Sequence, residues 1–292
     1  MKRLFYSLVI LSSMMFACNI STPGTPIVVT SPPVVTITPL VTVPPVEPVT
    51  PMVTLSPVDT LAPIVTVEPI ATNLNCNELS LFLDPALASG FSCETIPEST
   101  EGMEMFPQYT RLTLQGYILS GKFFEPHLAL LPIQRYSELL PDLVPGSVSD
   151  LQALVSGGAA GEPLPFLPDF NAAQMFHAQF LALPFASGGG IRYMTQYAQY
   201  FVTVNNTDLF YTYQGLTSDG KYWVSAILPI NNPILAANAD TLPAGMSMED
   251  FNNNYGSYIT GMIDQLNSQA SDSYTPSLAA LDALVASITI QP

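Results

Sequence analysis

The most regular hydrophobic pattern in the chain lies between Gln174 and Leu228, where apolar stretches alternate with short polar or glycine-rich segments. One of these segments contains Asp219-Gly220 flanked by aromatic and β-branched residues, which is a strong signal for a tight hairpin. The pattern predicts a four-strand antiparallel meander. Its strands are expected at residues 174–185, 191–204, 208–216 and 221–228, with turns at Ser187–Gly190, Asn205-Asn206 and Ser218–Gly220.

Both faces of this meander carry apolar residues. In the last strand, alternate residues from Tyr222 to Leu228 share one face, while Trp223, Ser225 and Ile227 share the other. Because both faces are partly apolar, each must be covered by another element. We expect two C-terminal helices to provide this cover: one from Ser247 to about Gln269, opened by Ser247 and Asp250, and one from Ser277 to Ser287, with a buried stripe of Leu278, Leu281, Leu284, Val285 and Ile288.

Shorter elements are predicted ahead of the meander. They are a helix at Glu78–Leu83, strands at Tyr109–Leu119 and Leu128–Ile133, helices at Gln134–Leu140 and Ser149–Ser156, and a loop from Gly157 to Pro168. Strands bracketed by helices in this way predict an α+β fold with a mainly antiparallel sheet. We expect residues 73–292 to form a single globular domain of this class.

The first seventeen residues read as a secretion signal. Lys2 and Arg3 form a positive start, and Leu4 to Phe16 is an apolar stretch interrupted only by serines. Thirteen helical residues rise about 20 Å, which is too short for a bilayer core of roughly 30 Å. Residues 1–17 are therefore predicted to be a signal peptide and not a permanent membrane span.

Directly after this stretch, Met15-Phe16-Ala17-Cys18 resembles the lipobox of bacterial lipoproteins. The resemblance implies that the Cys18 sulfur receives a diacylglycerol group, that cleavage occurs before Cys18, and that the new amino terminus is acylated, for example with palmitate. Several acyl chains together give a stable anchor where a single chain would not. The alternative is an ordinary secretion site, which requires small residues at both flanking positions, and Met15 disfavours it.

The three cysteines agree with an exported lipoprotein. An odd number in an exported chain leaves one thiol to explain, and lipid attachment to Cys18 accounts for it. Cys76 and Cys93 then remain, and an oxidising compartment favours a disulfide between them. A metal site is the alternative, but further cysteine or histidine ligands at short spacing are missing from the sequence.

Residues 18–72 form a proline-rich linker in this interpretation. Twelve of the 28 prolines lie between Ser21 and Thr72, within a degenerate repeat of valine, threonine and proline. Such frequent proline removes backbone donors and favours extended conformations, so a disordered stalk is expected. It would hold the domain away from the membrane.

The charge of the chain excludes one class of partner. The net charge is −16, and Lys2 and Arg3 are the only basic residues among the first 110. Once the signal peptide is removed, five basic residues face 23 acidic ones, and the net charge becomes −18. A surface so poor in lysine and arginine cannot neutralise a run of phosphates, so no nucleic-acid partner is expected.

Sequence motifs for catalysis are missing. The chain has only two histidines, His127 and His177, and no Gly-x-Ser-x-Gly, His-Glu-x-x-His or nucleotide-binding glycine motif. A structural histidine is the first interpretation of His177, because it lies inside a predicted strand. We therefore expect no cofactor and no metal.

Aromatic residues are the class in excess, since nine of them lie between Tyr193 and Trp223. Packing within the sheet is the first interpretation, because strands favour aromatic side chains. The alternative is an aromatic surface for a ligand, since tyrosine and tryptophan suit half-wet contact sites. The candidate ligand contacts are Tyr197, Tyr211, Tyr213 and Trp223.

Two short stretches, Arg192–Tyr197 and Leu216–Tyr222, resemble an uncharacterised domain of bacterial cell-surface lipoproteins. The resemblance covers roughly residues 73–292 and implies no activity. We therefore expect a non-enzymatic module, anchored in a bacterial membrane and facing away from the cytoplasm, which binds carbohydrate, peptide or an envelope protein. The alternatives are an extracytoplasmic hydrolase with a site outside the known motifs and a passive structural surface protein.

Overall fold

A computed structural model describes residues 72–102, 104–159 and 161–291 of the chain. The predicted signal peptide, the predicted lipidation site at Cys18 and the predicted proline-rich linker as far as residue 71 lie outside the described residues. The predictions made for them stay predictions. The fold below is that of the part which follows the linker.

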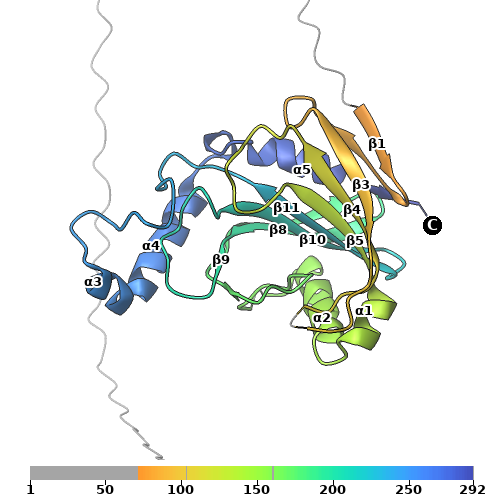
Figure 1. Ribbon diagram of the computed structural model, residues 1–292, viewed down its shortest axis with the longest axis horizontal. Coiled ribbons are helices and arrows are strands. Elements are labelled where there is room, and N and C mark those ends of the chain that lie inside the picture. The colour runs from red at the N-terminus through yellow and green to blue at the C-terminus, as the bar shows by residue number, and fades with distance from the viewer. Residues whose placement is uncertain (1–71, 103, 160, 292) are drawn as a thin grey trace, which may run out of the picture. The chain divides into compact units, whose positions relative to one another are not determined.

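A seven-stranded antiparallel sheet forms the centre of the fold, in the order β3-β4-β5-β11-β10-β8-β7 (Figure 1). The α+β class predicted from the sequence is confirmed. The strands are β3 (Gly90–Ile96), β4 (Tyr109–Gln115), β5 (His127–Pro132), β7 (Ala178–Phe185), β8 (Gly188–Thr195), β10 (Phe210–Thr217) and β11 (Tyr222–Pro229).

The predicted four-strand meander is confirmed as β7, β8, β10 and β11, each paired antiparallel with the next. One turn was placed wrongly. Gly188 to Gly190 do not form a turn but begin β8, because this strand passes very close to β10. A Cβ atom at Gly190 would lie 2.3 Å from the carbonyl oxygen of Gln214, so only glycine fits there. The expected strand at 191–204 is also shorter, since β8 ends at Thr195.

A second, very small sheet follows β8. It pairs β9 (Tyr197–Ala198) with β6 (Ala173–Gln174). This pairing ties the segment after β8 to the segment before β7, and it places Tyr197 outside the main sheet.

Helices cover both faces of the main sheet, as the apolar pattern of β11 predicts (Figure 1). The two C-terminal helices do not cover both faces, however, because α4 (Tyr255–Ser268) and α5 (Leu278–Ala286) pack with Val224, Ala226 and Leu228 on one and the same face. The opposite face, with Trp223 and Ile227, is covered by α1 (Ile133–Leu139) and α2 (Val144–Val155).

The expected helix at Glu78–Leu83 is wrong, because this segment forms β2 (Leu79–Leu83). Leu79, Leu81 and Leu83 are buried while Phe82 is exposed, which is a strand period. β2 lies between β1 (Thr72–Cys76) and β12 (Thr289–Ile290) in a three-stranded sheet.

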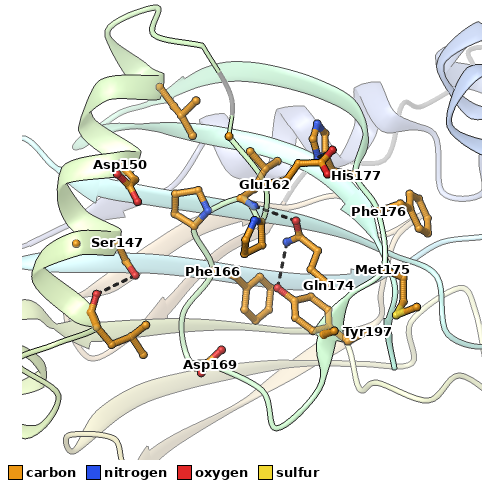
Figure 2. A pocket seen from close by; sticks show the side chains of 18 of the residues that line it. Ser147, Asp150, Glu162, Phe166, Asp169, Gln174, Met175, Phe176, His177 and Tyr197 are labelled. Carbon is orange, nitrogen blue, oxygen red and sulfur yellow. Dashed lines mark hydrogen bonds and ion pairs between the residues drawn. The ribbon is translucent and has the colours of Figure 1, made fainter. Parts of the chain in front are cut away.

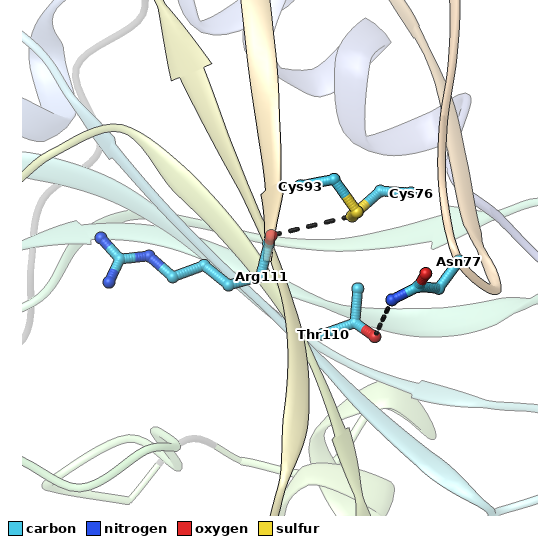
Figure 3. The surroundings of a disulfide bond; sticks show 5 residues. All are labelled: Cys76, Asn77, Cys93, Thr110 and Arg111. Atoms are coloured by element: carbon cyan, nitrogen blue, oxygen red, sulfur yellow. Dashed lines mark hydrogen bonds between the residues drawn. A yellow bond between two sulfur atoms is a disulfide. The ribbon is translucent and has the colours of Figure 1, made fainter. Parts of the chain in front are cut away.

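The predicted disulfide between Cys76 and Cys93 is present and joins this three-stranded sheet to β3, the edge of the main sheet (Figure 3). A hydrogen bond nearby adds to the connection, since the Asn77 amide donates to the Thr110 hydroxyl at 3.2 Å. The chain is thus held to the main sheet within a few residues of the point where the described domain begins.

Two helix boundaries differ from those expected. α2 begins at Val144 rather than at Ser149, with a proline in its first turn, so that Ser149, expected as the capping residue, lies inside the helix. The predicted helix after Ser247 is divided at Asn254 into α3 (Met248–Asn253) and α4.

The cap at Ser247 is confirmed, because its hydroxyl accepts the backbone N–H of Asp250. The helix expected from Ser277 is also present as α5, and Ser277 itself is its cap, since its hydroxyl accepts the Ala280 N–H. A short 3-10 helix at Ser271–Ser273 precedes α5. None of the helices in the described ranges has the length and apolar character needed to cross a membrane.

Candidate functional site

Three of the four aromatic residues predicted to contact a ligand are buried in the core. The side chains of Tyr211, Tyr213 and Trp223 each have 0% of their surface exposed. Their polar atoms bond inside the protein: Trp223 Nε1 to Gln214 Oε1 at 2.7 Å, Tyr211 OH to Asp282 Oδ1 at 3.0 Å, and Tyr213 OH to the Leu183 carbonyl at 2.9 Å. The prediction is therefore wrong for these three, because helices cover both faces of the strands that carry them.

The fourth candidate, Tyr197, lies in a different setting. It is half-buried on β9 and lines two neighbouring clefts at once. The loop from Gly161 to Ala172 takes part in both. We call the larger one the acid cleft, after Asp150, Glu162 and Asp169 in its wall, and the other the aromatic cleft, after Phe123, Phe124, Phe170, Tyr197 and Tyr200.

The acid cleft has a volume of about 900 Å³ and lies between α2 and residues 159–177. Figure 2 shows Ser147 and Asp150 on α2 at one side, with Glu162 beside His177 at another. Asp169 completes the set of acids, and burial raises the pKa of its carboxyl group.

His177 meets a carboxylate in this cleft. Its Nδ1 lies 3.9 Å from Glu162 Oε1, and the Glu162 side chain is 77% exposed. Burial lowers the pKa of His177, and the charge of Glu162 acts in the opposite direction. Among the described residues, the hydrogen bonds join no hydroxyl to His177, and the Ser147 hydroxyl donates to the Leu143 carbonyl of its own helix region.

Gln174 fixes the wall between the two clefts. Its amide nitrogen donates to the hydroxyl oxygens of Tyr193 and Tyr197 at 3.3 and 3.1 Å, and its carbonyl oxygen accepts the Leu164 N–H at 3.0 Å (Figure 2). Because every polar atom of this half-buried amide is engaged, Tyr197 has a defined position between the clefts.

The aromatic cleft has a volume of about 570 Å³. Phe124 and Phe170 stack with their ring centroids 5.1 Å apart, and Tyr197 meets Phe170 edge to face at 5.0 Å. Phe123 and Tyr200 also line this cleft and are largely open to solvent, with 71% and 73% of their surfaces exposed. The cleft therefore has an ordered aromatic floor and two exposed rings.

The polar groups around these rings are acids and amides. Glu104, Asp208 and Gln199 line the aromatic cleft, together with Asn171. The Gln199 amide donates to the Asn171 carbonyl at 2.7 Å, and one oxygen of Asp208 accepts from the Asn205 amide at 2.8 Å. The cleft thus combines apolar rings with hydrogen-bond acceptors, which is the usual composition of a small-molecule site.

His127 lies apart from both clefts, beside a third hollow of about 370 Å³. Its Nδ1 is 2.8 Å from the Glu125 carbonyl oxygen, and burial lowers the pKa of the ring to about 4. A neutral histidine that donates to a backbone carbonyl is a structural residue.

Apart from Tyr197, the rings that build the aromatic cleft were not among the predicted contacts. Phe123 and Phe124 lie in a segment without periodicity between β4 and β5, and Tyr200 lies just beyond β9. The sequence signal that could have found them is the pair of adjacent phenylalanines outside any predicted strand, because no predicted sheet would bury their rings.

Comparisons of this chain with protein-family models, with curated proteins and with solved structures found no match. Within the ranges 72–102, 104–159 and 161–291, no group of three or more histidine, cysteine, aspartate or glutamate side chains is arranged to hold a metal ion. The fold and the two clefts are therefore the features that indicate a function.

Proposed function

We propose that this protein is a membrane-tethered extracytoplasmic binding module and that the aromatic cleft is its ligand site. The exposure of Phe123 and Tyr200 beside an ordered aromatic floor is the observation that carries the proposal. Large aromatic rings gathered on one surface are more typical of a contact site than of an inert face.

The energetics support a ligand in this cleft. Covering about 100 Å² of apolar ring surface corresponds to about 2.5 kcal/mol at the usual coefficient. The free energy gained by covering two such rings offsets part of the entropy cost of immobilising a small ligand. The carbonyl and carboxylate oxygens at the rim would set its orientation.

The tether belongs to the same proposal. We infer it from the apolar leader, from Cys18 at its end and from the pairing of the two other cysteines, which leaves Cys18 for the lipid. Membrane fractions of an expressing bacterium provide the test, with Cys18→Ser as the variant. The variant is expected in the soluble extracytoplasmic fraction, and retention in the membrane like the wild type would contradict lipid attachment.

Binding is tested on the full chain by thermal shift, with a panel of neutral oligosaccharides, peptides and alkylammonium salts. A Phe123→Ala/Tyr200→Ala variant is expected to lose the shift that the wild type shows. Phe82→Ala is the matched control, since Phe82 is 52% exposed on β2 and lines neither cleft. A shift that persists in the double variant would place the site elsewhere, and no shift with any probe would contradict the binding function.

A hydrolase is the second candidate, favoured by the pair of His177 and Glu162 in the acid cleft. Acid–base catalysis needs a histidine that exchanges protons near pH 7, and the lowered pKa of His177 suits a base better than an acid. Chromogenic esters, glycosides and phosphate esters test this candidate. Turnover that His177→Gln abolishes would favour it over the binding module.

A further inference from the structure

The two clefts are lined by acidic side chains. Glu104 and Asp208 line the aromatic cleft, and Asp150, Glu162 and Asp169 line the acid cleft. No lysine or arginine is present among the described residues that line either of them. Clefts lined by one sign of charge concentrate ions of the opposite sign.

The basic residues of the described domain are engaged elsewhere. Each of the five has a partner: Arg111 with Glu125, Arg135 with Glu98 and Glu138, Arg192 with Asp282, Lys221 with Asp219, and Lys122 with the carbonyl oxygens of Asn206 and Ile230 and the side chain of Asn231. The charge of Asp208 acts on Lys122 from the neighbouring segment, but it does not bring the ammonium group into the cleft lining. Among the described residues, none of these five side chains forms an ion pair with an acid that lines either cleft, so the cleft acids remain available to a cationic ligand.

Aromatic rings select among cations. The face of an aromatic ring attracts a positive charge through its quadrupole, most strongly when that charge is poorly hydrated. A small inorganic cation is strongly hydrated and needs a cluster of oxygen ligands, which the described part of the chain does not provide. An ammonium group that carries methyl groups fits both the acids and the rings of the cleft, because its positive charge complements the acids and its methyl groups pack on the rings.

We propose that the aromatic cleft binds an organic cation of the alkylated ammonium class. Phe123, Tyr200 and the stacked floor take the methyl groups, while Glu104 and Asp208 supply the opposing charge. This inference rests on the proposed binding function and adds the chemical class of the ligand. A neutral sugar would use the same oxygens as acceptors but would gain nothing from the net negative charge around the cleft.

The test compares two probes of nearly identical shape on the full chain. Choline carries a trimethylammonium group, and 3,3-dimethylbutan-1-ol replaces it by an uncharged tert-butyl group. Calorimetric titration is expected to show choline bound at least about tenfold more tightly, which is the ratio that a favourable cation–ring contact provides. The affinity for choline is expected to fall with added salt, because the attraction is partly between exposed charges.

Substitutions separate the contributions of the rings and of the acids to the choline affinity. Phe123→Ala/Tyr200→Ala is expected to abolish choline binding, and Glu104→Gln is expected to weaken it about threefold to tenfold. Glu249→Gln is the matched control, since Glu249 lies in the first turn of α3 and lines neither cleft, and it is expected to leave the affinity unchanged. Thermal unfolding of each variant verifies that it remains folded.

Three outcomes would overturn the inference. Equal affinity for the two probes, with both weakened in the double variant, would show a binding site that does not select charge, and the proposed function would stand. Choline binding that the double variant leaves intact would place the cation outside the aromatic cleft. If choline does not bind but a neutral saccharide of the thermal-shift panel does, the ligand class is wrong and the binding function again stands.

Discussion

Two groups of aromatic residues in this protein differ in what surrounds them. Tyr211, Tyr213 and Trp223 lie in the meander strands, fully buried, and their polar atoms bond to partners within the domain. Phe123 and Tyr200 lie in segments between strands and expose most of their surface. A high density of aromatic residues in a sequence therefore indicates a core as readily as a binding site, and exposed rings are the better sign of binding.

The difference has a simple structural cause. A strand with helices on both sides buries its side chains in both directions, so neither half of its alternation reaches solvent. The segments that follow β4 and β9 leave the sheet, and no helix of the described part covers Phe123 or Tyr200. Aromatic residues there can form the wall of a cleft.

The largest expected effect concerns the buried group. Trp223→Ala removes the largest side chain of the core cluster between the sheet and α2, and it leaves Gln214 Oε1 without one of its donors. We expect a loss of about 3–5 kcal/mol in the free energy of unfolding, measured by chemical denaturation. A loss below about 1 kcal/mol would contradict the central role of Trp223 in the core.

The disulfide tests whether stability and binding can be separated. Cys76→Ser/Cys93→Ser opens a loop of seventeen positions, which is expected to cost about 3 kcal/mol. Because neither cysteine lines the aromatic cleft, ligand affinity should remain that of the wild type under conditions where the variant is folded. A parallel loss of affinity would show that the cleft depends on the three-stranded sheet.

Acid should lower the stability of the fold through His127. The pKa of His127 is lowered from 6.5 to about 4 by burial, so the unfolded chain binds a proton between these values while the native chain does not. Stability is therefore complete above pH 6.5 and is lost as the pH falls toward 4, by up to about 3 kcal/mol. Denaturation at several pH values should show this loss, and His127→Gln should reduce it. An unchanged pH dependence in the variant would assign the loss to other groups.

The smallest effect on stability is expected at the exposed rings. Tyr200→Ala and Phe123→Ala should each change the free energy of unfolding by less than about 0.5 kcal/mol, because most of each ring is already in water. Denaturation of the two single variants beside Trp223→Ala makes the comparison direct. A loss above about 1 kcal/mol in the free energy of unfolding of either variant would mean that the ring stabilises the fold, which would contradict its role as an exposed ligand contact.

Local sequence patterns were sufficient for part of this fold. The alternation from Tyr222 to Leu228 predicted two covered faces, Asp219-Gly220 predicted the hairpin between β10 and β11, and Ser247 with Asp250 predicted a helix start. Each of these depends on residues within one strand or one turn of helix. The disulfide followed from a count of cysteines, which likewise needs no knowledge of the fold.

Contacts between distant segments decided the rest. Leu79 to Leu83 became a strand because β1 and β12 pair with it from near the two ends of the described chain, and Gly190 entered β8 because β10 passes too close for any side chain. The aromatic cleft arises in the same way, since Phe123, Phe170 and Tyr200 come from three separate segments. Local sequence was enough to locate the aromatic residues and the strands of the meander, whereas tertiary packing decided which rings are buried and which remain open, because burial depends on the elements that cover them.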